Sequence, residues 1–254
     1  MPSPLLKERC KALKLAYVPV CYENIPYQNK EQYLTDLFGE ELRERQAHKV
    51  RRLIKRAGFL STKTLEEFDW SPVTLQPPTT QADLESLAFL TRNENVLALG
   101  AVGTGKTHLA TALGLKACLE GKAVRFYRCL DLVNQLLESH REGRLARLMR
   151  ELDRVDLLII DELGFVPLHP DGAQLLFNVV AKCYERKSII ITSNIQFGEW
   201  NRVLGDNRLT AALIDRLVHH AHILAFSGES YRLKKALATL ETANARATAE
   251  LSET

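Results

Sequence analysis

Residues 96–107 combine a short apolar run, a glycine-rich loop and the start of an amphipathic helix. They fit the pattern G-x-x-x-x-G-K-[ST] of loops that bind nucleoside triphosphates. Glycines let backbone N–H groups approach phosphate oxygens, and the following helix adds its positive dipole end. Lys106 can reach the β- and γ-phosphates, and the Thr107 hydroxyl can bind Mg²⁺. The candidate phosphate-binding residues are Gly100, Ala101, Val102, Gly103, Thr104, Gly105, Lys106 and Thr107.

Two carboxylates, Asp161 and Glu162, follow the apolar run 157–160. Four consecutive apolar residues predict a strand buried on both faces, and open α/β sheets bind ligands at the carboxyl ends of such strands. We expect Asp161 to bind Mg²⁺, directly or through water, and Glu162 to orient and polarise an attacking water. Because a protein that only binds nucleotide does not need the second carboxylate, the pair favours hydrolysis over an ordinary acidic turn.

Two further polar residues are candidates for completing the site. Asn194 follows the strand expected over 188–192 and suits contact with a γ-phosphate, the alternative being a turn-forming asparagine. Arg216 lies on a helix before the last expected strand, where an arginine can reach the γ-phosphate of a neighbouring subunit. Arg208 is its rival on the same segment, and a surface salt bridge is the alternative for either arginine.

The elements that must position these residues alternate between strand and helix from residue 96 onward. We expect strands over 96–99, 123–127, 156–160, 188–192 and 222–226. This alternation predicts an α/β P-loop NTPase, with a parallel sheet covered by helices on both faces. The expected divisions are a helical N-terminal domain for oligomerisation or for DNA or partner binding over 1–70, a proline-containing linker over 71–81, an ATPase domain over 82–230 and a helical tail over 231–254.

Two clusters of basic residues are candidate DNA contacts, although a solvated helix face is the usual meaning of such runs. The first cluster lies on an N-terminal helical run and comprises Lys49, Arg51, Arg52, Lys55 and Arg56. The second comprises Arg141, Arg144 and Arg147, with Arg150 continuing the three-residue repeat around a helix that has one apolar side. Such a helix can lie along a phosphate backbone.

Composition narrows the class of protein. The chain has 254 residues, is 46% hydrophobic and carries a formal net charge of +3, so it can form a packed core. Its five cysteines lack C-x-x-C spacing, and neither a signal-peptide region nor a membrane-spanning run is present, so we expect a reduced, cytoplasmic protein. His219, His220 and His222 cluster without a carboxylate at ligand spacing, and we interpret them as structural or exposed residues.

Several longer runs together resemble the IstB family. They are TLEEFD at 64–69, GAVGTGKTHLA at 100–110, IIDELGF at 159–165, TSN at 192–194, DRLVHH at 215–220 and GESYR at 228–232. The resemblance covers about residues 30–235 and implies an AAA+ ATPase fold with ATP and Mg²⁺ as cofactors. It further implies that the loop through His108 binds nucleotide, that Thr107 and Asp161 hold the metal, and that Glu162, Asn194 and Arg216 act in catalysis. Arg232 would be a further nucleotide contact.

The family role implied by this resemblance is that of a transposition helper. Such a protein assembles as a homo-oligomer on double-stranded DNA and recruits or stimulates a transposase of the IstA type. The alternative is a replicative helicase loader of the DnaC type, which shares the ATPase core and prefers single-stranded DNA. A nucleotide-gated DNA-binding scaffold with incidental hydrolysis is a third interpretation.

Overall fold

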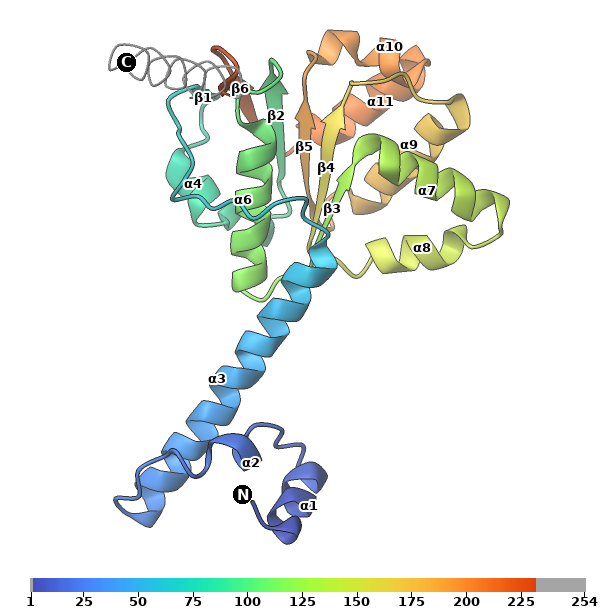
Figure 1. The fold of residues 1–254 in the computed structure, drawn as a ribbon. Coiled ribbons are helices and arrows are strands. Elements are labelled where there is room, and N and C mark those ends of the chain that lie inside the picture. Colours follow the sequence, from blue (N-terminus) through green and yellow to red (C-terminus); the bar gives the residue numbers. More distant parts are fainter. Residues whose placement is uncertain (1, 232–254) are drawn as a thin grey trace, which may run out of the picture. The chain divides into compact units, whose positions relative to one another are not determined.

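The chain divides into two compact units, Met1–Lys55 and Arg56–Thr254. The computed structural model, drawn in Figure 1, describes residues 2–231. None of the helices in this range combines the length and the apolar character that a membrane span requires.

The first unit is helical and is built on a small core. Its elements are α1 (Pro4–Ala12), α2 (Val18–Cys21) and most of α3 (Lys30–Ala57). Cys10, Val18 and Leu37 pack together there. The buried Glu41 carboxylate accepts hydrogen bonds from Arg45 Nε at 2.6 Å and from three backbone N–H groups that begin α2, those of residues 16–18. Burial raises the pKa of Glu41, but these donors outweigh it and lower the pKa overall.

The second unit contains a six-stranded sheet in the order β1-β6-β2-β5-β4-β3. The strands are β1 (Val73–Leu75), β2 (Asn95–Gly100), β3 (Val124–Arg128), β4 (Leu157–Leu163), β5 (Ser188–Ser193) and β6 (Ala221–Phe226). All neighbouring pairs are parallel except β1 with β6. The predicted α/β sheet is confirmed, and β5 lies between the strands that carry the phosphate loop and the acidic pair.

Helices cover both faces of this sheet (Figure 1). One face packs against α6 (Lys106–Leu119), and the other packs against α7 (Cys129–Arg141), α9 (Pro170–Cys183) and α11 (Asn207–Val218). Side chains of β4 alternate between these layers, as strand geometry requires. The shorter helices of this unit are α4 (Gln81–Glu85), α5 (Ala88–Thr91), α8 (Leu145–Leu152), a 3₁₀ turn (Phe197–Glu199) and α10 (Trp200–Leu204).

The segment 71–81, which we predicted to be a linker, contributes to the sheet. Val73 pairs with Phe226 and Leu75 pairs with Leu224, so β1 is an antiparallel edge strand of the second unit. The division between the units lies earlier, within α3. A strand of three residues beside several prolines is too short to show a hydrophobic period, so sequence patterning does not predict it.

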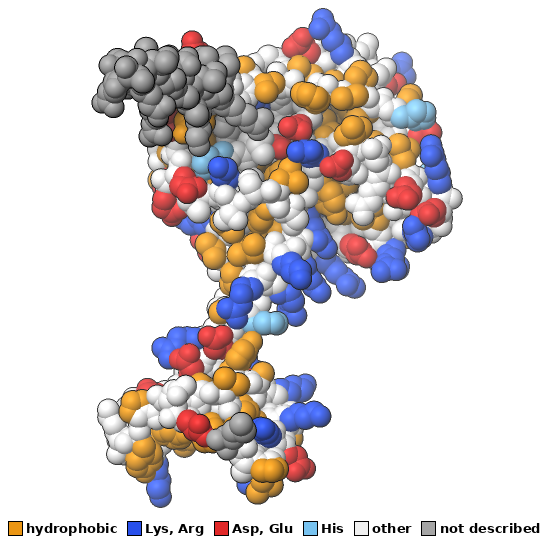
Figure 2. Space-filling model, viewed as in Figure 1, with side chains coloured by type: hydrophobic (Ala, Val, Ile, Leu, Met, Phe, Trp, Pro, Cys, Tyr) orange, Lys and Arg blue, Asp and Glu red, His pale blue; other side chains and the backbone are white. Residues whose placement is uncertain are grey.

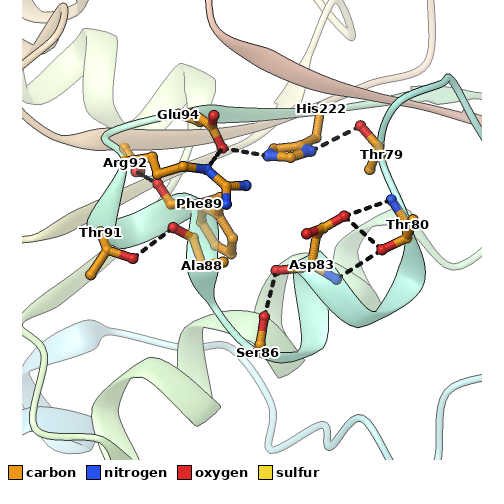
Figure 3. Close-up of polar contacts among 11 residues, drawn as sticks. Thr79, Thr80, Asp83, Ser86, Ala88, Phe89, Thr91, Arg92, Glu94 and His222 are labelled. Carbon is orange, nitrogen blue, oxygen red and sulfur yellow. Dashed lines mark hydrogen bonds and ion pairs between the residues drawn. The ribbon is translucent and has the colours of Figure 1, made fainter.

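A polar network ties the segment before β2 to β6 (Figure 3). The Glu94 carboxylate accepts hydrogen bonds from Arg92 and pairs with His222 Nε2, both at 2.8 Å. The other ring nitrogen of His222 lies 2.9 Å from Thr79 Oγ1. Burial raises the pKa of Glu94, but the bonds from Arg92 and His222 outweigh it and lower the pKa overall. His222 is therefore a structural residue, as we expected.

Candidate nucleotide-binding site

The glycine-rich loop joins β2 to α6 and depends on glycine at three positions. Gly105 is the N-cap of α6, with φ at +104°. A Cβ atom on Gly100 would lie 2.1 Å from the carbonyl oxygen of Phe226, and one on Gly103 would lie 2.1 Å from Ser230 Oγ. The close packing that excludes side chains here also leaves the loop amides free of side-chain cover. This is the cradle that the motif predicts.

Lys106 opens α6 and is buried against the loop. Its ammonium group donates hydrogen bonds to the carbonyl oxygens of Gly100 at 2.8 Å and Ala101 at 2.6 Å. Thr104 Oγ1 donates to the same Ala101 carbonyl at 2.9 Å and stiffens the turn. The cation is thus held over the phosphate cradle, where a phosphate oxygen can take the place of these carbonyls.

Three neighbouring elements bring hydroxyl and carboxylate oxygens together beside this loop. Asp161, at the end of β4, is only 1% exposed. Its Oδ1 accepts hydrogen bonds from Thr107 Oγ1 of α6 at 2.9 Å and from Thr192 Oγ1 of β5 at 2.5 Å. Hard oxygen donors of this kind suit Mg²⁺. We predicted Thr107 and Asp161 as a pair but assigned no role to Thr192, although it begins the TSN run at 192–194.

A bulge in β4 separates the two carboxylates of the acidic pair. The register against β5 shifts between Ile160 and Leu163, and Glu162 has a left-handed φ of +62°. The Glu162 N–H donates to Thr192 Oγ1 at 2.9 Å, so the same hydroxyl anchors both acidic residues. Bulges commonly re-aim side chains beside functional sites. Here Asp161 stays buried while the Glu162 side chain is exposed at the cleft.

Arg128 is a partner of Glu162 that sequence reasoning missed. It ends β3 opposite Asp161 in the parallel register, and its Nε lies 3.7 Å from Glu162 Oε2. Both side chains are about half exposed, so water screens this ion pair. Arg128 therefore lies beside the Glu162 carboxylate at the edge of the cleft.

A cleft joins these groups, lined by Val102, Gly103, Lys106, Thr107, Glu162, Phe165, Thr192 and Asn194. The side-chain oxygen of Asn194 is buried there without a hydrogen-bond partner. A buried amide oxygen in this position calls for a donor such as water, or for the flipped amide facing an anion. The glycine cradle, the oxygen donors and this orphaned amide together fit a nucleoside triphosphate with Mg²⁺.

Two segments distant in sequence pack against the phosphate loop. His108 Nε2 lies 3.0 Å from the Thr64 carbonyl oxygen, and its ring packs edge-on against Phe68. His108 therefore anchors the 64–68 segment and is absent from the cleft lining. On the other side, the Tyr231 N–H donates to the Gly103 carbonyl at 3.0 Å. The TLEEFD and GESYR runs were the only sequence signals for these contacts.

The predicted finger arginine does not reach the cleft of its own chain. Arg216 Nη1 donates to the Ala212 carbonyl at 2.9 Å, and its guanidinium carbon lies 4.8 Å from the centre of the Phe177 ring of α9. Arg208, its rival, is exposed near the start of α11. Arg232 and the expected tail beyond Tyr231 lie outside the described residues.

The histidine cluster gains a carboxylate that its own segment lacks. Glu185, after α9, places Oε1 3.9 Å from both His219 Nδ1 and His220 Nε2. His219 and His220 are exposed, as expected, but together with Glu185 they form a group that could hold a metal ion. Glu185 lies near the histidines because α9, which precedes Glu185, packs against α11, which precedes His219.

Several predicted DNA contacts are already paired with carboxylates. Arg51 of the first unit forms an ion pair with Glu44 at 3.5 Å. In the second unit, Arg144 pairs with Glu142, and Arg147 Nε lies 3.2 Å from Glu151. Lys49, Arg52, Lys55 and Arg56 lie on α3, and Arg141 ends α7.

The chain is similar to known proteins in sequence and in fold. The family described as IstB-like ATP binding protein matches residues 23–239. The chain is 40% identical over 235 residues to the "Insertion sequence IS5376 putative ATP-binding protein" of Geobacillus stearothermophilus, covering 91% of this chain and 90% of that protein. It is also 40% identical to the "Insertion sequence IS21 putative ATP-binding protein" of Pseudomonas aeruginosa, covering 82% and 78% of the two chains.

Among solved structures, AMPPCP-bound DnaA from Aquifex aeolicus aligns with a TM-score of 0.53 and 23% identity. The alignment covers 73% of this chain and 56% of that one. At this identity the likeness concerns the fold, which is that of AAA+ proteins.

Proposed function

Since the chain belongs to the IstB-like ATP-binding protein family, we propose that it is a cytoplasmic transposition helper that hydrolyses ATP, assembles on duplex target DNA and recruits or stimulates a transposase of the IstA type. The observation that carries the proposal is the 40% identity, over nine-tenths of both chains, to an insertion-sequence ATP-binding protein. AAA+ architecture and ATP binding follow from the family, and the remaining steps are proposed from the site.

Hydrolysis is supported by the residues gathered at the carboxyl edge of the sheet. Gly100–Thr107 would hold the triphosphate, with Lys106 against the β- and γ-phosphates. Thr107 and Asp161 would hold Mg²⁺, which neutralises phosphate charge when bound. Glu162 lines the cleft with an exposed carboxylate, beside Arg128, and would orient and polarise the attacking water. Asn194 would hold that water through its unpartnered side-chain oxygen or, with the amide flipped, the γ-phosphate through its NH2 group.

Assembly is supported by what the cleft of a single chain lacks. Apart from Lys106, the described residues that line it include no cationic side chain, and Arg216 rests on Phe177 instead. We infer that Arg216 of one copy contacts the γ-phosphate bound by its neighbour. ATP would then favour the oligomer, and hydrolysis would release it.

Two measurements on the purified chain test this proposal. The first is the rate of ATP hydrolysis alone, with duplex DNA and with single-stranded DNA. The second is the molecular size in ADP and in a non-hydrolysable ATP analogue. The proposal expects stimulation by duplex and growth in size with the analogue. Preference for single strands would favour the helicase-loader alternative, and slow hydrolysis indifferent to DNA would favour the scaffold alternative.

A further inference from the structure

Basic residues precede three adjacent strands at the amino edge of the sheet, opposite the nucleotide cleft. Lys122 lies just before β3, Arg154 before β4 and Arg186 before β5. Neighbouring strands are about 4.8 Å apart, so the three positions fall within a row about 10 Å wide. The length of β4, at about 3.3 Å per residue, separates this row from the nucleotide cleft by about 20 Å.

These three side chains line a hollow of about 250 Å³ that also contains the carboxylates of Asp153 and Asp156. Asp153 lies 3.5 Å from both Lys182 and Lys187, and Asp156 accepts a hydrogen bond from the Ala123 N–H at 2.7 Å. Lys187 is buried and is used there, since it also donates to the Leu152 carbonyl. Burial raises the pKa of Asp153, but Lys182, Lys187 and Arg186 outweigh it and lower the pKa overall.

The side chains of the other three cations have no direct partner of this kind. Within residues 2–231, the side chains of Lys122, Arg154 and Arg186 form neither an ion pair nor a hydrogen bond. Three charged groups so close together repel one another, and an external anion would relieve that repulsion. The charged lining comprises four cations, Lys122, Arg154, Arg186 and Lys187, against two carboxylates, Asp153 and Asp156, so the hollow keeps an excess of positive charge.

A second hollow, of about 470 Å³, continues this surface along α8. It is lined by Arg147, Arg150, Glu151 and Arg154, and Arg154 belongs to both hollows. Glu151 is taken by Arg147, which leaves Arg150 and Arg154 unpaired among the described residues. Figure 2 shows Lys and Arg side chains, interspersed with Asp and Glu, on this margin of the second unit. We name the unpaired set Lys122, Arg150, Arg154 and Arg186 the amino-edge basic strip.

We propose that the amino-edge basic strip binds the sugar-phosphate backbone of duplex DNA, an assignment that rests on the proposed function. A row of unpaired cations spanning two hollows suits a line of phosphates better than a single small anion. The described lining of both hollows contains no aromatic side chain, whereas sites for single strands stack bases on aromatic rings. A protein partner would also require an apolar centre, and Leu90 and Val155 are the only aliphatic side chains in that lining.

The strip also revises which arginines should contact DNA. Arg144 and Arg147 were predicted from their spacing, but their ion pairs with Glu142 and Glu151 reduce the charge they can offer. Arg154 and Arg186 lie on loops more than thirty residues apart and share no periodic pattern. Only the parallel order of β4 and β5 places them together.

The test is the salt dependence of duplex binding by the full chain, measured with an ATP analogue. For Arg154→Ala combined with Arg186→Ala, we expect weaker binding and a slope of log K against log salt that is about 2 units shallower, because each lost phosphate contact removes about 0.9. The charge-preserving pair Arg154→Lys and Arg186→Lys should keep most of the slope. Arg202→Ala, which removes an exposed arginine paired with Glu199 on α10, is the matched control and should leave the slope unchanged.

Two outcomes separate this inference from the proposed function. If the wild-type chain binds duplex and the double alanine variant binds with the same affinity and slope, the strip is not the contact surface and the inference is wrong. If the wild-type chain does not bind duplex at all, the proposed function itself fails. ATP-analogue binding should be equal in every variant, since the strip lies at the opposite edge from the cleft, and unequal binding would show that the substitutions disturb the fold.

Discussion

The two edges of the same sheet differ in whether their charged side chains have partners within the chain. At the carboxyl edge, Asp161 is buried and satisfied by two threonine hydroxyls, so its geometry is fixed before any ligand arrives. At the amino edge, Arg154 and Arg186 form no ion pair or hydrogen bond through their side chains within the part of the chain that is described, and they lie in an open hollow. The first arrangement suits precise chemistry on one small ligand, and the second suits a grip on a long polyanion.

The difference implies that substitutions at the two edges should have separable effects. Changes at the carboxyl edge should alter turnover while leaving the salt dependence of DNA binding intact. Changes at the amino edge should alter that salt dependence while leaving nucleotide affinity intact. The predictions below test this separation, and they begin with the largest effect.

Arg216→Ala should reduce ATP hydrolysis by about 10³–10⁵-fold, the range for an arginine finger. The reason is that the described residues lining the cleft include no arginine, so a neighbouring copy would have to supply one. Steady-state phosphate release, measured at a concentration that permits assembly, checks the effect. Arg208→Ala serves as the comparator, because a loss confined to that variant would transfer the role to the rival residue.

Mixing variants decides whether Arg216 acts between copies. Lys106→Ala subunits retain Arg216, and Arg216→Ala subunits retain a complete phosphate loop, so mixed assemblies should regain part of the activity. Absence of recovery at every mixing ratio would contradict a finger supplied by the neighbour.

Glu162→Gln should slow hydrolysis by about 10²–10⁴-fold while nucleotide affinity stays within a few-fold of wild type. The amide keeps the shape of the side chain but cannot accept a proton from water. Single-turnover hydrolysis and fluorescent-nucleotide titration measure the two quantities separately. Turnover equal to wild type would remove Glu162 from the proposed role, and Arg128 would then be only its surface partner.

Thr192→Val should lower turnover by about 10–100-fold without abolishing nucleotide binding, because the hydroxyl positions two groups at once. It would leave Asp161 short of one donor and the Glu162 N–H without an acceptor. Thr192→Ser retains the hydroxyl and is the matched control. If valine and serine variants turn over equally, the hydroxyl has no positioning role.

Glu94→Gln should reduce the free energy of unfolding by about 1–3 kcal/mol at pH 7, since it weakens charged hydrogen bonds to Arg92 and His222. The pKa of Glu94 is lower in the folded chain than in the unfolded one. Its contribution is therefore fully present above the unfolded pKa of about 4.3 and is lost as the pH falls through the folded value.

Urea unfolding at pH 7 and near pH 3 measures this contribution. The gap between wild type and Glu94→Gln should narrow at the lower pH. Glu120→Gln, an exposed carboxylate at the end of α6, should show little effect at either pH. A gap that widens on acidification would contradict the assigned sign.

The carboxyl edge was largely predictable from sequence because its chemistry is local. The phosphate loop is one continuous run of sequence, and so is the Asp161–Glu162 pair. Apolar runs such as 157–160 predicted the buried strands that carry them. Thr192, Arg128 and Glu185 were missed because their roles depend on which strand or helix lies beside them. The same reason applies to the amino-edge basic strip, because only the order of the strands brings its members close together.

The central claim is that ATP hydrolysis at the carboxyl edge of the sheet is coupled to binding of duplex DNA at the amino edge. The most direct test is the steady-state rate of ATP hydrolysis with and without duplex DNA, for the wild-type chain and for the Arg154→Ala, Arg186→Ala variant. We expect duplex to raise the wild-type rate and to raise the variant's rate less at the same DNA concentration. A wild-type rate that is identical with and without duplex would contradict the coupling.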